Sequence, residues 1–261
     1  PAGRITGTDK ASGGNAGWLI GHETNNSAIL TNRLLKAGVQ PAWVKEAVTL
    51  GNDTLAPGSI WVPASAVAGA VVKTAVAELG LTAHAAARPP ASPTTRLRPV
   101  RIGLVYRYGG LMTAGWTRWV LEQYEFPFEV VYPQRVEAGG LKRQFDVLLF
   151  ADGALPGKGA WGGERGSSQP RPEDTPAEWK AATGTLTDPK TMPALTEFFR
   201  AGGAVVAVGG SARLAEMFGA PLALAQSRTE NGEARALDTK EFFIPGSVLR
   251  AQVDNLSLIH I

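Results

Sequence analysis

The sequence contains no cysteine, so disulfides, zinc–thiolate sites and cysteine nucleophiles are all excluded. Histidine is scarce as well, with only His22, His84 and His260 present. No apolar run approaches the roughly 20 residues that a membrane-spanning helix needs, and we expect no membrane span. What remains for a functional site is mainly hydroxyl, carboxylate, guanidinium and aromatic chemistry.

The charges of the chain are nearly balanced. Its 261 residues carry 26 Lys and Arg against 23 Asp and Glu, a formal net charge of +3. The cations are scattered, apart from Arg96, Arg98, Arg101 and Arg107 around one predicted strand. Because no basic helix or aromatic-interleaved basic stripe occurs, we expect no nucleic-acid partner. The length allows one large domain or two modest ones.

Both ends of the sequence are typical of a fragment. The chain starts at Pro1 without an initiator methionine or a signal peptide, so we expect the natural N-terminus to lie upstream. Residues 256–261 read L-S-L-I-H-I and resemble a translated sequencing adapter. We expect them to be a non-native tail, which would remove His260 from consideration; the alternative is a natural apolar tail.

Apolar patterns divide the chain into two parts. Residues 1–92 combine a short buried strand around Leu19 with helical stripes, and we expect a small α/β segment there. Residues 88–99 hold four prolines and few apolar side chains. We therefore place a linker at 93–99 and a larger domain at 96–255.

The larger domain opens with a βαβ unit. Residues 102–106 predict a buried strand and residues 128–132 predict the next one. Between them, Trp116, Trp119 and Val120 recur at i, i+3 and i+4, and we expect this stripe to cover the sheet. Further apolar strands follow along the chain. The expected fold class is α/β, with a mostly parallel sheet flanked by helices.

Ser211 follows the predicted strand 204–208 and two glycines, which is the sequence of a strand, a sharp turn and a helix. In a nucleophile elbow, such a serine projects above the sheet and a histidine follows later in the chain. The only later histidine is His260, and G-G-S-A-R departs from G-x-S-x-G at its last position. Ser211 as the N-cap of the next helix is the simpler interpretation.

Ligand sites of parallel sheets lie at the carboxyl ends of the strands. Asp152 ends a predicted strand, and Arg107, Trp116 and Arg118 belong to the neighbouring βαβ unit. Together with Ser211 they form the candidate ligand crevice of this chain. The alternative interpretation places the tryptophans in the core and Arg118 on a solvated face.

Neither His22 nor His84 has the sequence partners of a metal site. His22 and Glu23 lack the H-x-x-E spacing of zinc peptidases, and His84 lies in an alanine-rich stretch with no carboxylate nearby in the sequence. The glycines at 109, 110 and 115 depart from G-x-G-x-x-G and are better explained by tight turns. We therefore expect no catalytic residue, no metal ligand and no cofactor in this chain.

Several motifs together resemble the C-terminal region of bacterial zinc metallocarboxypeptidase-family proteins. In these, a carboxypeptidase A-like domain is followed by a class I glutamine amidotransferase-like domain. The W-T-R-W-V-L-E run and its F-P-F-E continuation are the most specific part of the resemblance, which covers most of residues 15–255. The matching segments are 17–26, 32–38, 101–122, 126–133, 145–153, 198–209 and 244–255.

The resemblance implies an amidotransferase-like or flavodoxin-like sheet over 96–255, truncated at its C-terminus. It also implies that the cysteine nucleophile is missing, because the turn at Ser211 reads V-G-G-S-A. The zinc-binding peptidase domain is expected upstream, so zinc belongs to that absent domain. The parent protein is expected to be secreted or periplasmic.

We therefore expect a non-catalytic accessory or binding region of a zinc metallocarboxypeptidase-like protein. Its expected partners are its own upstream peptidase domain and a peptide or small-molecule ligand. Two alternatives stay open at this point. One is a stand-alone serine-type hydrolase that uses Ser211, and the other is a purely structural module that docks on the peptidase domain.

Overall fold

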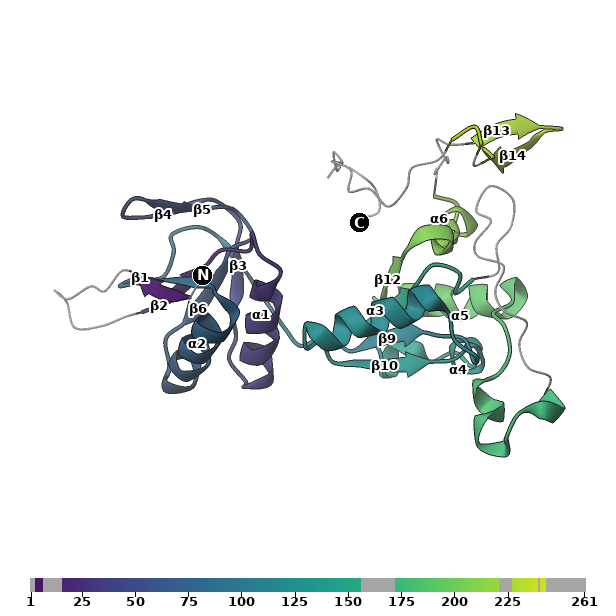
Figure 1. The fold of residues 1–261 in the computed structure, drawn as a ribbon, viewed down its shortest axis with the longest axis horizontal. Helices are drawn as coiled ribbons and strands as arrows, with labels where there is room; N and C mark the ends of the chain where they lie inside the picture. The colour runs from purple at the N-terminus through teal and green to yellow at the C-terminus, as the bar shows by residue number, and fades with distance from the viewer. Residues whose placement is uncertain (1–2, 7–15, 156–171, 221–226, 239, 243–261) are drawn as a thin grey trace.

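The computed structural model describes residues 3–6, 16–155, 172–220, 227–238 and 240–242. These residues form two α/β units, each with its own sheet and its own hydrophobic core (Figure 1). The predicted tail at 256–261 lies outside the described residues, as does the C-terminal part of the predicted larger domain. The α/β fold class is confirmed, and the main sheet of the C-terminal unit is parallel.

The N-terminal sheet has six strands in the order β1-β7-β2-β6-β3-β8. Only β1 and β7 pair in parallel, and the other neighbours are antiparallel. The strands are β1 (Arg4–Thr6), β2 (Gly17–Ile20), β3 (Ala42–Val44), β6 (Ile60–Pro63), β7 (Thr82–Ala86) and β8 (Thr94–Arg96).

Both faces of this sheet are covered. Helices α1 (Asn26–Lys36) and α2 (Ala66–Leu79) bury one face around Leu34 and Val72, and the hairpin of β4 (Val48–Leu50) and β5 (Asp53–Leu55) covers the other. Strand β8 lies inside the predicted linker and pairs with β3. The first unit therefore extends through part of the proline-rich segment.

The C-terminal sheet consists of four parallel strands in the order β10-β9-β11-β12. The two central strands are largely buried, as expected for apolar runs that are covered on both faces, whereas the two edge strands also carry exposed residues. The four strands are β9 (Ile102–Val105), β10 (Phe128–Val131), β11 (Val147–Phe150) and β12 (Ala204–Ala207).

Helix α3 (Met112–Gln123) lies over one face of this sheet, and α4 (Pro133–Glu137), α5 (Asp188–Arg200) and α6 (Arg213–Met217) share the core on the other (Figure 1). Short 3₁₀ turns and a hairpin complete the described chain. They are η1 (Leu141–Arg143), η3 (Pro172–Asp174), η4 (Ala177–Ala182), η5 (Gly209–Ala212), β13 (Ser227–Glu230) and β14 (Glu233–Ala236).

The predicted orientation of α3 is wrong. Its sheet-facing side carries Ala114 and Leu121, which are buried, whereas Trp116, Trp119 and Val120 are 62%, 50% and 43% exposed. The small Ala114 lets the helix approach the sheet closely. A stripe at i, i+3 and i+4 shows that a helix has an apolar side, but it does not show whether that side faces its own sheet.

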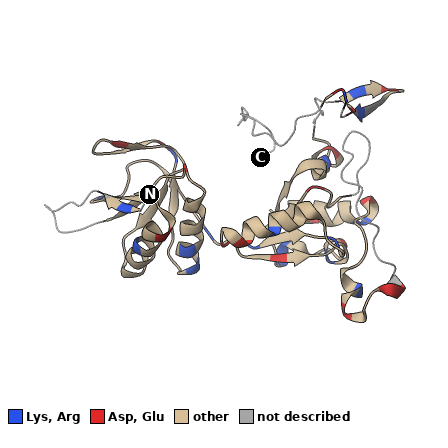
Figure 2. Cartoon of the chain, viewed as in Figure 1, with Lys and Arg blue, Asp and Glu red and all other residues tan. Residues whose placement is uncertain are grey.

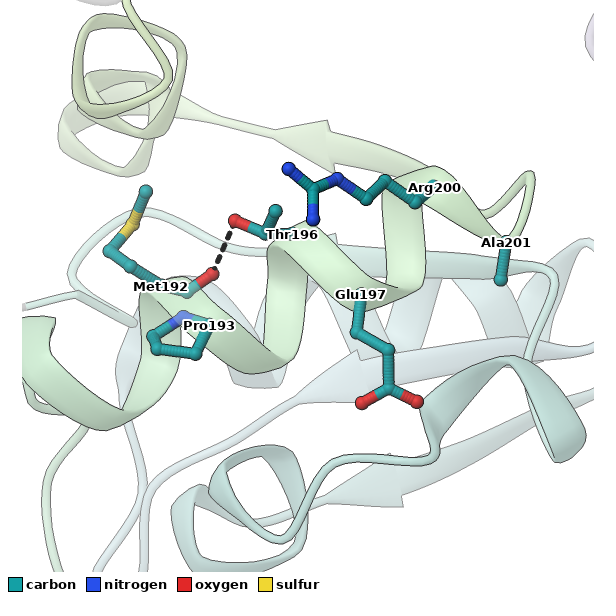
Figure 3. Close-up of a pocket in the computed structure, with 6 residues that line it drawn as sticks. All are labelled: Met192, Pro193, Thr196, Glu197, Arg200 and Ala201. Atoms are coloured by element: carbon teal, nitrogen blue, oxygen red, sulfur yellow. Dashed lines mark hydrogen bonds between the residues drawn. The ribbon is translucent and has the colours of Figure 1, made fainter.

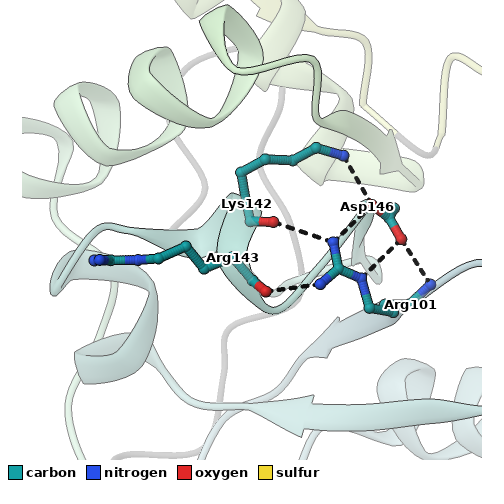
Figure 4. A network of polar contacts seen from close by, with 4 residues as sticks. All are labelled: Arg101, Lys142, Arg143 and Asp146. Carbon is teal, nitrogen blue, oxygen red and sulfur yellow. Dashed lines mark hydrogen bonds and ion pairs between the residues drawn. The ribbon is translucent and has the colours of Figure 1, made fainter.

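A network of charged contacts closes the amino-terminal edge of the parallel sheet (Figure 4). The Arg101 guanidinium donates to both carboxylate oxygens of Asp146 at 2.9 Å, and Lys142 Nζ donates to Asp146 at 2.8 Å. Arg101 also donates to the carbonyl of Arg143 at 2.7 Å. These hydrogen bonds, first those from Arg101 and then that from Lys142, hold the pKa of the Asp146 carboxyl far below its ordinary value.

Replacing Asp146 with asparagine is expected to lower the free energy of unfolding by about 1–2 kcal/mol at neutral pH, because charge-assisted bonds are lost at a partly exposed site. The folded-state pKa lies below the unfolded value of about 3.9. The contribution is therefore fully present above about pH 4 and shrinks as the pH falls further. Urea melts at pH 7 and pH 3 should show a smaller difference from the parent at pH 3.

The matched control for this prediction is Glu122→Gln, which removes the exposed pair between Glu122 and Arg118. It should cost less than about 0.5 kcal/mol, as other i, i+4 surface pairs do. A loss for Asp146→Asn that equals the control would mean that the network does not hold the sheet edge.

Candidate functional site

The carboxyl ends of β11 and β12 meet in a small polar cluster. Asp152 Oδ1 accepts a hydrogen bond from the backbone of Gly210 at 2.6 Å, and Thr113 Oγ1 donates to the Asp152 carbonyl at 2.6 Å. Gly209 has φ +58, and a Cβ there would lie 2.5 Å from the Asp152 carboxyl. The glycine is therefore required for the close approach of the turn to the carboxylate.

Ser211 lies in the same cluster, within η5. Its side chain is fully buried, and its hydroxyl donates to the carbonyl of Ala151 at 2.7 Å. The predicted N-cap role is wrong, because the short turn η5 intervenes and α6 begins after Ala212 without a side-chain cap. The serine ties the end of β11 to the turn that follows β12.

The cluster does not have the arrangement of an activated nucleophile. A nucleophilic serine needs a base within hydrogen-bond reach and an accessible Oγ. Here the Ser211 proton goes to a backbone carbonyl. Two of the three histidines, His22 and His84, belong to the N-terminal unit, and His260 lies outside the described residues. The cluster therefore holds the backbone at the end of β11 against the turn after β12, and it does not activate Ser211.

Ser211→Ala is expected to destabilise the protein by about 1 kcal/mol, because the buried Ala151 carbonyl loses the hydroxyl bond and keeps only the one from the Ala154 backbone. It should leave p-nitrophenyl acetate hydrolysis at the uncatalysed rate, in the parent as in the variant. Urea melts and the ester assay measure the two effects. Ser65→Ala, which removes the N-cap bond of α2, is the control and should cost about 1 kcal/mol. Ester hydrolysis that disappears with Ser211 would make it a nucleophile.

Among the described residues, no hydrogen bond or ring contact links the two predicted crevice members on α3 to Asp152 or Ser211. Trp116 and Arg118 are on the surface of α3, where Trp116 contacts Trp119 edge to face at 5.8 Å and Arg118 pairs with Glu122 at 2.8 Å. Arg107 follows β9 and is partly buried. The structure thus brings Asp152 and Ser211 together, while the two α3 residues belong to an exposed helix surface.

A pair that the sequence did not reveal lies in the N-terminal unit. His84 Nδ1 is 3.3 Å from Asp53 Oδ2, in a polar cavity of about 300 Å³ that Glu23 also lines. His84 has no carboxylate close to it in the sequence, but the β4–β5 hairpin brings Asp53 next to it in the fold. Among the described residues, no group of three or more potential ligands is placed to hold a metal ion.

A shallow depression of about 710 Å³ runs along α5 (Figure 3). Every residue that lines it comes from this one helix or its end, and the hydroxyl of Thr196 is bonded to the Met192 carbonyl at 2.8 Å. Glu197 and Arg200 extend from the helix as separate charges. The depression therefore offers an open surface without a reactive pair of groups.

The outward side of α3 carries the most exposed apolar surface on any described helix. We call Met112, Trp116, Trp119 and Val120 the α3 ridge; Met112 is 73% exposed, and the other three are 43–62% exposed. The predicted apolar stripe is therefore real, but it faces away from the sheet. Charged residues of both signs are spread over both units (Figure 2).

The fold and these surfaces define an α/β protein of two units with a buried polar cluster at the ends of the parallel strands. No family model, no curated protein and no solved structure matches the chain. Within the described part of the chain, none of the helices is long and apolar enough to cross a bilayer.

Proposed function

We propose that this chain is a non-catalytic accessory region of a zinc metallocarboxypeptidase-like protein, and that it binds the peptidase domain through the α3 ridge. The observation that carries the proposal is the exposure of two tryptophans and a methionine on one side of a helix. Contiguous exposed apolar surface of this kind marks interaction sites. Tryptophan is also among the residues that contribute most to binding at interfaces.

The size of the ridge is sufficient for the core of an interface. An aromatic side chain can bury about 150–250 Å², so the exposed parts of the four ridge residues supply roughly 400 Å². That is about half of the ~800 Å² that each partner buries in an interface of standard size. The neighbouring pair of Arg118 and Glu122 would lie at the rim, where polar groups are usual.

The polar cluster supports an accessory role rather than a catalytic one. Its two most reactive groups, the Asp152 carboxylate and the Ser211 hydroxyl, are both bonded to backbone. As the resemblance implies, the proposed zinc belongs to the peptidase domain, where it would polarise the scissile carbonyl and activate water. The parent protein is proposed to be secreted or periplasmic, as the resemblance implies.

We also propose that the C-terminal unit has an amidotransferase-like or flavodoxin-like fold, and its strand order supports this. Numbered from β9, the order β10-β9-β11-β12 reads 2-1-3-4, the first four positions of the flavodoxin-like order 2-1-3-4-5. An amidotransferase-like domain fits this arrangement. A small-molecule or peptide ligand would then be expected near Asp152, at the carboxyl edge of the sheet.

A calorimetric titration tests the proposal. The chain is titrated with a carboxypeptidase A-like zinc peptidase domain from the bacterial proteins whose C-terminal regions it resembles. We expect saturable 1:1 binding, because the ridge supplies one continuous patch. Absence of binding at micromolar concentrations, with both proteins folded, would contradict the proposal.

A further inference from the structure

The two units are joined by a clamp between α1 and the end of α3. Arg33 donates to Glu125 through Nε at 3.1 Å and through Nη2 at 2.9 Å, and to Glu78 through Nη1 at 2.6 Å. Asn32 Nδ2 donates to the carbonyl of Tyr124 at 2.8 Å. One turn of α1 therefore holds the residues that immediately follow α3.

The backbone at this joint adopts a conformation that its residue type disfavours. Glu125 has φ +56, and it occupies the position after a helix end where glycine is usual. The hydrogen bonds from Glu125 N to the Glu122 carbonyl and from Phe126 N to that of Leu121 fix this turn. A non-glycine residue is kept in this region only when its surroundings enforce it. Arg33 holds the Glu125 side chain at this turn, and the next residue, Phe126, lines a cavity together with residues of the N-terminal unit.

A cavity of about 370 Å³ lies beside the clamp, with Phe126 as its wall from the second unit. The rings of His22 and Trp43 line it from the first unit, and Trp43 is 49% exposed. Gly58 leaves room for the imidazole, since a Cβ there would lie 3.3 Å from the His22 ring. The volume falls within the range of small-molecule sites, which occur preferentially between domains.

The polar groups of the cavity select the class of ligand. No lysine, arginine, aspartate or glutamate is among the described residues that line it, which favours a neutral ligand. The hydroxyl protons of Ser27 and Thr31 go to backbone carbonyls, and Asn32 donates to Tyr124. The lone pairs of these hydroxyls and the Asn32 amide oxygen are left as acceptors. A ligand should therefore bring a donor of its own.

We propose that this junction cavity binds a neutral, flat aromatic group that carries an N–H or O–H donor. The ring inserts between Trp43 and Phe126, where edge-to-face or offset contacts are favourable, and its donor bonds to the acceptors of α1. Because the walls come from both units, the ligand holds the units together. This site is independent of the α3 ridge and of the proposed docking function.

Indole is the probe that tests the site, in a ligand-observed NMR titration of the full chain. We expect saturable binding that weakens at least tenfold in Trp43→Ala and in Phe126→Ala. Trp119→Ala is the matched control, because it removes a ring of equal exposure outside the cavity, and it should stay within twofold of the parent. 1-Methylindole, which lacks the donor, should bind several-fold more weakly than indole.

A second kind of variant fills the cavity and leaves all of its lining aromatic residues in place. Ala28→Phe places a ring in the space that indole would occupy, and it should abolish binding while the thermal midpoint stays within a few degrees. Non-saturable binding of indole, or equal affinity in all four variants, overturns the proposal. A loss confined to Trp119→Ala would overturn it as well, because it would place the indole on the ridge.

Discussion

Replacing Phe198 with alanine is expected to lower the free energy of unfolding by about 3–5 kcal/mol. Phe198 is 1% exposed and lies in the core that α5 forms with the parallel sheet. Gly203 packs so closely that a Cβ there would lie 2.4 Å from the Phe198 ring. The cavity left by alanine would thus be lined by rigid backbone. The loss is a large part of the 5–15 kcal/mol that stabilises a typical domain.

The neighbouring Phe199 is the matched control for Phe198. It is 38% exposed and makes one edge-to-face contact with Phe218, with ring centroids 4.7 Å apart. Phe199→Ala should cost about 1–2 kcal/mol, because its ring is partly exposed and contacts the rings of Phe218 and Phe198. Denaturant melts of the two variants decide the ranking. Equal losses would mean that α5 is rotated relative to the sheet.

Leu34→Ala is expected to have the second largest effect, about 2–5 kcal/mol, on the N-terminal unit. Leu34 is fully buried between α1 and the six-stranded sheet, among Leu30, Val72 and Val76. Its sequence neighbour Leu35 is only partly buried and provides the control. Leu35→Ala should cost clearly less, because its methyl groups are already in contact with water.

The two core variants also test whether the units fold separately. The cores around Leu34 and Phe198 share no residue. In Leu34→Ala, hydrogen exchange should therefore become faster in β7 and stay unchanged in β9. In Phe198→Ala, it should become faster in β9 and stay unchanged in β7. Faster exchange in both strands for either variant would show that the clamp at Arg33 makes one cooperative unit of the two.

The parallel sheet was the part of the fold most accessible from the sequence. Strands such as β9 and β11 are buried on both faces, and their continuous apolar runs are visible without any tertiary information. The N-terminal unit was harder to predict from the sequence. Its strands are short and mostly antiparallel, and their order in the sheet differs from their order along the chain. Strand β8 follows two prolines at 89 and 90, which favoured a linker there.

The candidate site was predictable where it depends on strand ends. The carboxyl ends of parallel strands meet at one edge of a sheet, which predicts that Asp152 and Ser211 lie close together. Both side chains form hydrogen bonds with backbone groups at that edge. The orientation of Trp116 was missed, because an apolar stripe has the same spacing whether it meets a sheet or a partner. The pair of Asp53 and His84 depends on where a hairpin folds, and no local pattern encodes that position.

The most direct test of the docking proposal is the calorimetric titration with the peptidase domain, repeated with Trp116→Ala/Trp119→Ala. We expect the dissociation constant to rise at least tenfold, since central tryptophans contribute about 2 kcal/mol or more each. Trp43→Ala, which removes a tryptophan of matched exposure elsewhere, and Ser211→Ala should leave it unchanged. Equal binding by the double variant and the parent would contradict docking through the α3 ridge.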